Sequence, residues 1–212
     1  MNGITVGMAI VDFIPVVLFF IAAVVLQRDL YNKMVKGAFA LLAAGSILVL
    51  IGGAYKALWK ILYAVGVCDY AALDTAFFPM QAPGFLLVFA SLFAMLTRKG
   101  KGAAPLLAAV PVYESNLPFI AGQTLGCAGM QACLFLLARR MKKPLACVLF
   151  VVAFVCMMAM GYLGAKFDDT SDMHWLAQVT NVVSQSALLL GVITLHRAGL
   201  AAPDALTKGA RA

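Results

Sequence analysis

The chain has 212 residues, of which 64% are hydrophobic and 12% are charged, and its formal net charge is +7 at pH 7. Soluble globular domains average about 45–50% apolar and about 25% charged residues, so this composition excludes an ordinary soluble domain. The positive charge lies in loops that follow hydrophobic stretches. This arrangement argues against nucleic acid as a partner and for a chain inserted in a lipid bilayer.

The long apolar stretches predict helices that cross a membrane, because one crossing needs about 20 mainly apolar residues. In chain order, the clear stretches cover residues 5–27, 37–54, 77–96, 144–163 and 174–195. The second continues to Tyr63 as an amphipathic segment. The stretch over residues 144–163 carries no charged or amide side chain and is expected to face lipid.

The segment of 37 residues between Lys101 and Arg139 is harder to assign. Basic clusters flank it on both sides, so the chain must cross an even number of times if both clusters are cytoplasmic. Two short helices over residues 103–117 and 121–138, with a turn around Pro118, satisfy this condition, since 17 residues of helix reach about 25 Å. A re-entrant hairpin is the alternative.

The distribution of charge predicts the orientation. Thirteen of the 16 Lys and Arg residues fall in four clusters, namely Arg28, Lys33, Lys36; Arg98, Lys99, Lys101; Arg139, Arg140, Lys142, Lys143; and Arg197, Lys208, Arg211. Five of the nine acidic residues lie between these clusters, at Asp69, Asp74, Asp168, Asp169 and Asp172. Basic loops stay on the cytoplasmic side. We therefore expect an all-α integral membrane protein, a bundle of about seven transmembrane helices with the N-terminus outside and the C-terminus cytoplasmic. Residues 1–197 would form one transmembrane domain and residues 198–212 a short cytoplasmic tail.

Two acidic residues fall inside predicted crossings, where an ionisable group is costly and is by default a functional candidate. Asp12 lies in the first helix, three residues before Pro15, which would loosen the backbone. Glu114 lies in the fourth, near Asn116 and between two prolines. The predicted topology places both acids in the outer part of the membrane. They are candidates to line a cavity open to the outside, and the alternative is simple hydration at the headgroup level.

The last predicted helix carries a regular polar stripe. His174, Gln178, Asn181 and Gln185 follow one another at helical spacing, so they share one face. Val182, Leu189 and Val192 are expected on the opposite face. Amides in hydrocarbon need partners, so the stripe must face protein or water. It is either a row of solute-binding groups or a set of interhelical hydrogen bonds.

Two further groups are candidates. Gln123 and Gln131 lie eight residues apart on the fifth predicted helix and are expected to oppose the stripe of the seventh. Lys56 and Lys60 lie one turn apart among aromatic residues on the amphipathic end of the second helix. They are either part of an interfacial aromatic belt or a vestibule that attracts an anionic solute.

Signatures of catalysis and of metal binding are not found. The sequence has no H-E-x-x-H, G-x-S-x-G or C-x-x-C motif, so no cofactor, no metal site and no catalytic residue are expected. The favoured function is a small polar-solute transporter or channel of the cell membrane, coupled to protons if Asp12 or Glu114 exchanges one. The alternatives are a ligand receptor that acts through a partner protein, and an intramembrane lipid-modifying enzyme. The expected partners are the lipid bilayer and a small polar solute, and the sequence allows a homo-oligomer.

Overall fold

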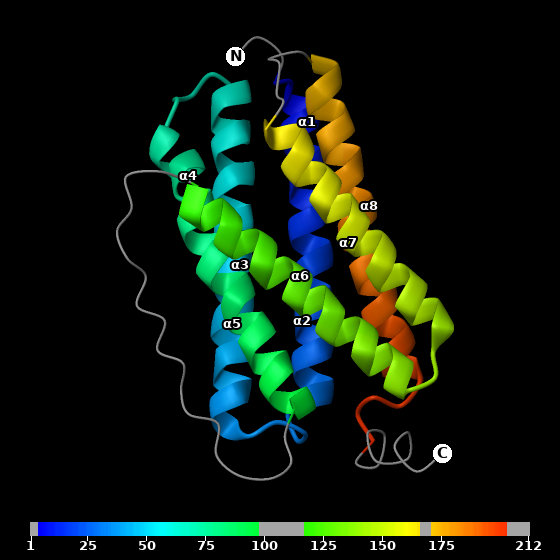
Figure 1. Ribbon diagram of the computed structural model, residues 1–212. Coiled ribbons are helices and arrows are strands. Elements are labelled where there is room, and N and C mark those ends of the chain that lie inside the picture. The colour runs from blue at the N-terminus through cyan, green and yellow to red at the C-terminus, as the bar shows by residue number, and fades with distance from the viewer. Residues whose placement is uncertain (1–3, 98–116, 166–170, 203–212) are drawn as a thin grey trace.

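A computed structural model shows the chain as a bundle of helices (Figure 1). The structure describes residues 4–97, 117–165 and 171–202. The helices are α1 (Val6–Val11), α2 (Phe13–Leu30), α3 (Lys36–Ala64), α4 (Ala71–Thr75), α5 (Phe77–Thr97), α6 (Leu117–Arg140), α7 (Pro144–Ala165) and α8 (Ser171–Arg197). Within the described ranges there is no strand.

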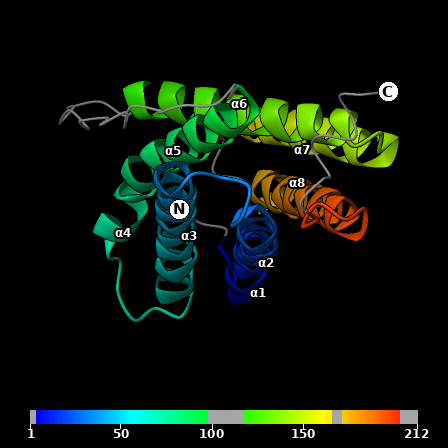
Figure 2. The same ribbon diagram turned by 90° about the horizontal axis from the view of Figure 1, so that it is seen from below.

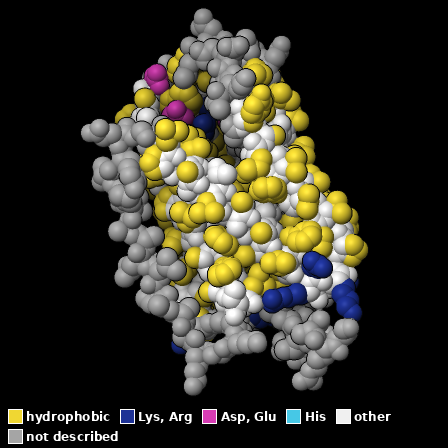
Figure 3. Space-filling model, in the orientation of Figure 1, with side chains coloured by type: hydrophobic (Ala, Val, Ile, Leu, Met, Phe, Trp, Pro, Cys, Tyr) yellow, Lys and Arg dark blue, Asp and Glu magenta, His cyan; other side chains and the backbone are white. Residues whose placement is uncertain are grey.

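Five helical segments are long and apolar enough to cross a membrane, by length and composition. They are Val6–Leu30, Lys36–Ala64, Ala71–Thr97, Leu117–Arg140 and Met173–Arg197, and a shorter apolar stretch covers Pro144–Met160. Hydrophobic side chains cover the face seen in Figure 3. On α7 the exposed side chains include Leu145, Val148, Val151 and Val155, in agreement with the predicted lipid-facing surface. The chain thus has several helices with the length and composition of a multi-pass membrane protein.

The predicted crossings match the observed helices in those parts of the chain where charged residues, Gly or Pro mark both ends of an apolar run. The second crossing and its amphipathic extension form one continuous helix, α3. The turn predicted around Pro118 is wrong, because α6 already begins at Leu117. Proline is favourable in the first turn of a helix, where its missing N–H has no partner to lose. Residues 103–116 of the predicted fourth crossing lie outside the described residues.

The long helices pack in a closed ring. Going round it, α2 contacts α3, α3 contacts α5, α5 contacts α6, α6 contacts α7, α7 contacts α8, and α8 contacts α2. Seen end-on, α6 and α7 lie across one side, whereas α3, α2 and α8 lie across the other (Figure 2). The core fills the centre, with Phe19, Leu42, Val88, Met130 and Leu188 among its buried side chains.

Glycines bring α5 close to both of its neighbours. A Cβ atom added at Gly45 of α3 would lie 2.6 Å from the carbonyl oxygen of Gly84, and one added at Gly126 of α6 would lie 2.7 Å from the backbone nitrogen of Leu86. Side chains larger than hydrogen would therefore push these backbones apart. Small residues at helix crossings are common where packing, rather than the hydrophobic effect, holds membrane helices together.

α5 and α6 run in the same direction. Near their first turns, Gln123 contacts Gln81, and at their last turns the Arg140 guanidinium donates to the Leu96 carbonyl oxygen at 3.3 Å. The end of α5 and the start of α6 consequently lie at opposite ends of the bundle (Figure 1).

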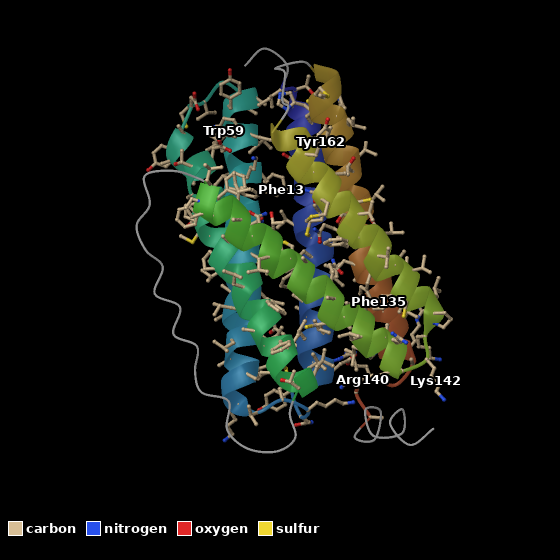
Figure 4. All side chains as sticks on the ribbon, in the orientation of Figure 1. Phe13, Trp59, Phe135, Arg140, Lys142 and Tyr162 are labelled. Atoms are coloured by element: carbon tan, nitrogen blue, oxygen red, sulfur yellow. The ribbon has the colours of Figure 1, made fainter. Side chains whose placement is uncertain are left out.

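The two ends of the bundle differ in charge. Most of the basic side chains visible in Figure 3 gather at the end where α2, α5, α6 and α8 finish, whereas the visible acidic side chains lie at the opposite end beside a further basic side chain. Arg140 and Lys142 mark the first end and Trp59 marks the second (Figure 4). At that second end, the Trp59 indole donates to Asp69 at 2.9 Å. We call the two ends the basic end and the acidic end.

Candidate functional site

Asp12 is the boundary between α1 and α2, and its own backbone keeps the α-helical conformation. Pro15 has no backbone N–H, so the Val11 carbonyl loses the donor that a regular helix would give it at that position. The Asp12 N–H still donates to the Met8 carbonyl oxygen at 3.1 Å. Pro15 thus removes one hydrogen-bond donor beside Asp12, and the wider loosening of the helix predicted from it stays a prediction.

Asp12 forms an ion pair with Lys60 of α3. Their side chains are only 12% and 13% exposed, respectively, so both charges are largely removed from solvent. Lys56, one turn away, is more open: it lies 3.7 Å from Asp74, both side chains are 36% exposed, and its ammonium stands 4.6 Å from the centre of the Phe77 ring. The two predicted vestibule lysines thus have acidic partners, and the side chains of the Lys60 pair are the less exposed of the two pairs.

The polar stripe of α8 turns inward over part of its length. Gln178 and Gln185 are buried, and Asn181 is half-buried. The Gln178 Nε2 atom donates to the Met8 carbonyl oxygen at 2.9 Å, which ties α8 to α1 one turn above Asp12. Next to Gln185, the Ser184 hydroxyl donates to the Ala153 carbonyl oxygen at 2.9 Å. The two glutamines therefore occupy the predicted inner face.

The outer face predicted for α8 is wrong. Val192 is 1% exposed and Leu189 packs against the core. The exposed large side chains at this helix are instead Trp175, Leu176, Val179, Val183 and Leu190. α8 contacts α7 on one side and α2 on another, so only the arc between these neighbours is left for lipid. Spacing alone does not reveal where that arc lies.

A second polar group joins α3, α5 and α6. The Gln123 Nε2 atom donates to Gln81 Oε1 at 3.1 Å, and Gln81 Nε2 donates to the Val49 carbonyl oxygen at 3.3 Å. A Cβ atom added at Gly53 would meet both Val16 of α2 and the Gln81 amide, so this group lies close to α2 as well. We call Asp12, Lys60, Gln81, Gln123 and Gln178 the outer polar cluster.

Several buried amide atoms in the bundle have no hydrogen-bond partner. They are Gln123 Oε1, Gln178 Oε1, Gln185 Oε1 and both polar atoms of Gln131. Gln131 is 3% exposed and Gln185 is 8% exposed. An unpaired buried amide is unfavourable, so each of these atoms would gain from a hydrogen bond to water or to a polar ligand. Sequence reasoning named all four glutamines, but it gave no sign that so many of their atoms would be left without protein partners.

Below these amides the bundle is closed by apolar side chains. A cavity of about 20 Å³ lies among Phe19, Leu42, Met130, Leu188 and other residues of the core. Gln131 is adjacent to Met130 in the sequence, and Gln185 precedes Leu188 by about one helical turn, so these two amides lie close to this apolar region. Further toward the basic end, Leu30, Leu92, Leu137, Leu195 and Leu200 are completely buried.

A polar network joins α2 to α8 at the basic end. The Asp29 side chain is 0% exposed, and its carboxylate accepts from His196 Nδ1 at 2.9 Å. The Arg28 guanidinium lies 3.1 Å from His196 Nε2. When the His196 ring is neutral and carries its proton on Nδ1, Nε2 can accept a hydrogen bond from this guanidinium. Beside this network, the Lys33 ammonium donates to the Ala202 carbonyl oxygen at 2.6 Å.

Sequence reasoning missed Asp29. The residue stands next to Arg28 in a basic cluster, where a loop carboxylate exposed to solvent is the ordinary expectation. A helical projection of residues 13–30 gives the one available signal, because Asp29 falls on the same side as the buried Ala22 and Leu26.

Glu114 and Asn116 lie outside the described residues, so their predicted roles stay predictions. No group of three or more His, Cys, Asp or Glu side chains within the described ranges is arranged to hold a metal ion. No family model, curated protein or solved structure matches this chain. The site is therefore interpreted from its own chemistry: a nearly buried ion pair and a set of amide groups, enclosed by apolar helices.

Proposed function

We propose that the protein is a membrane transporter for a small polar solute, which reaches the outer polar cluster from the acidic end of the bundle. The observation that carries this proposal is the set of buried glutamine atoms without partners on α6 and α8. A bundle held together by interhelical hydrogen bonds alone would pair such groups, since the membrane interior offers no water to replace a missing partner.

The proposal includes a direction across the membrane. Lysines and arginines gather at the end where α2, α5, α6 and α8 finish, and this end would face the cytoplasm. The acidic end would then be outside, with the N-terminus and the outer polar cluster. Because α5 and α6 are parallel, the chain must return across the membrane between the end of α5 and the start of α6, and we further propose seven crossings in all.

The closed inner half supports a transporter over a channel. The apolar layer around Met130 and Leu188 separates the outer polar cluster from the basic end, and the Asp29–His196 contact holds α2 against α8 behind it. A solute would pass only after these contacts open.

The orientation can be tested with the native cysteines. Cys68 is exposed in the acidic-end loop, whereas Cys127 and Cys133 are buried. We expect a membrane-impermeant maleimide added outside intact cells to label the wild-type protein, and Cys68→Ser to abolish the labelling. In the C68S background, Arg140→Cys should react only after the membrane is permeabilised. Labelling of that cysteine in intact cells would contradict the proposed orientation.

The transport function can be tested by solute uptake into proteoliposomes and by variants of the unpaired amides. We expect Gln131→Met to reduce uptake at least tenfold while leaving the melting temperature unchanged or higher, because the protein loses no hydrogen bond. Thr124→Val on the same helix is the control, since the Thr124 hydroxyl only donates to the Ile120 carbonyl of its own helix.

Two results would count against transport. One is full uptake by the Gln131→Met variant, which would remove the amide from the solute path. The other is the failure of proteoliposomes to take up any polar solute faster than protein-free liposomes do. Binding that raises the melting temperature without any uptake would favour the receptor function instead.

A further inference from the structure

The ion pair between Asp12 and Lys60 indicates what kind of solute the outer polar cluster accepts, provided that the protein is a transporter as proposed. We infer that the solute is a zwitterion that carries an ammonium group and a carboxylate a few ångströms apart, as an α-amino acid does. The inference starts from the charges. One acid and one base contact each other, and each side chain is almost enclosed by protein.

A solute with both charges can replace both partners at once. Its ammonium would take the place of Lys60 on the Asp12 carboxylate, and its carboxylate would take the place of Asp12 on the Lys60 ammonium. Every buried charge would keep a partner, and the net charge of the site would not change. A cation or an anion would satisfy only one of the two side chains and leave the other charge buried without a partner, which is strongly unfavourable.

The neighbouring groups suit the ammonium end of such a solute. An ammonium has three donors and needs three acceptors. Besides the Asp12 carboxylate, the Val11 carbonyl lacks its helical donor because residue 15 is proline. Gln178 adds an unpaired Oε1 atom and is 3% exposed. Gln178 Nε2 and the Asp12 N–H both bind the Met8 carbonyl oxygen, so this amide lies within about one helical turn of the ion pair.

Lys56 supplies an internal comparison, because it differs from Lys60 in its surroundings and not in its chemistry. Its side chain and that of Asp74 are each 36% exposed, so water can replace either partner. A solute gains little by breaking such a pair. The selectivity for a zwitterion therefore depends on Lys60 and not on Lys56.

The test uses solutes of one size and different charge. The common L-amino acids are screened for a rise in the melting temperature of the purified full-length protein, and the best binder is compared with its amide, its 2-hydroxy acid and its 2-hydroxy amide. These analogues are a cation, an anion and a neutral molecule. We expect at least one amino acid to bind, and each analogue to bind at least tenfold more weakly.

Variants then locate the binding. The double variant Asp12→Asn/Lys60→Met leaves no unpaired charge and should fold, but it should lose the thermal shift given by the amino acid. Lys56→Met should keep the affinity within about twofold of wild type. Equal binding of the neutral analogue, no binding by any amino acid, or an unchanged shift in the double variant would each overturn the inference. Uptake of a sugar or another uncharged solute would also overturn it, while leaving the proposed transport function in place.

Discussion

The Lys60→Met variant should be less stable than the wild-type protein by about 3–5 kcal/mol in the free energy of unfolding. The substitution leaves the Asp12 carboxylate without its partner in a place where the Asp12 side chain is only 12% exposed. Most of the loss comes from the unpaired buried charge, not from the missing attraction. Thermal and denaturant unfolding in a fixed detergent or bicelle would measure the change.

The double variant Asp12→Asn/Lys60→Met separates these two contributions. With both charges removed, we expect most of the lost stability to return, because replacing a whole buried ion pair is often close to neutral. Lys56→Met is the matched control and should cost less than Lys60→Met, because Lys56 and Asp74 are each 36% exposed and water can solvate the charge that remains. If Lys60→Met unfolds at the same temperature as Lys56→Met, then Asp12 is hydrated and the ion pair is not an interior feature.

Replacement of Gly45 by Val should also have a large effect, about 3 kcal/mol or more, with loss of folded protein from membranes in the extreme case. A Cβ atom at this position would lie 2.6 Å from the Gly84 carbonyl oxygen and 2.9 Å from the Val88 nitrogen. These are backbone atoms of α5, which cannot rotate away as a side chain can. The helices α3 and α5 would have to separate, and the core residues between them would lose contact.

Gly37→Ala is the control on the same helix, because no atom lies within 4 Å of the added Cβ atom. Alanine is a better helix former than glycine, so this variant should be neutral or more stable by about 0.5–1 kcal/mol. The yield of folded protein after extraction and its melting temperature report both variants. Wild-type stability in Gly45→Val would mean that α3 and α5 are not in close backbone contact.

The crossings were largely determined by the sequence, because their signals are local. The predicted crossing over residues 77–96 corresponds to α5, Phe77–Thr97, and the one over residues 174–195 lies within α8, Ser171–Arg197. An apolar run, the charges or prolines at its ends and the length of helix needed to cross a membrane can all be read from neighbouring residues. The same reasoning failed at Pro118, where a residue typical of turns also suits the first turn of a helix.

The partners of the polar residues were decided only by the tertiary structure. Asp12 and Lys60 were named separately from the sequence, but nothing local shows that Asp12 faces α3. Asp29 looked like a loop residue, and its partner His196 lies 167 residues further along the chain. Which side of a helix meets a neighbour depends on how the ring of helices closes. Closure is set by long-range packing, such as the contact of Gly45 with Gly84, and hydrophobic periodicity does not encode it.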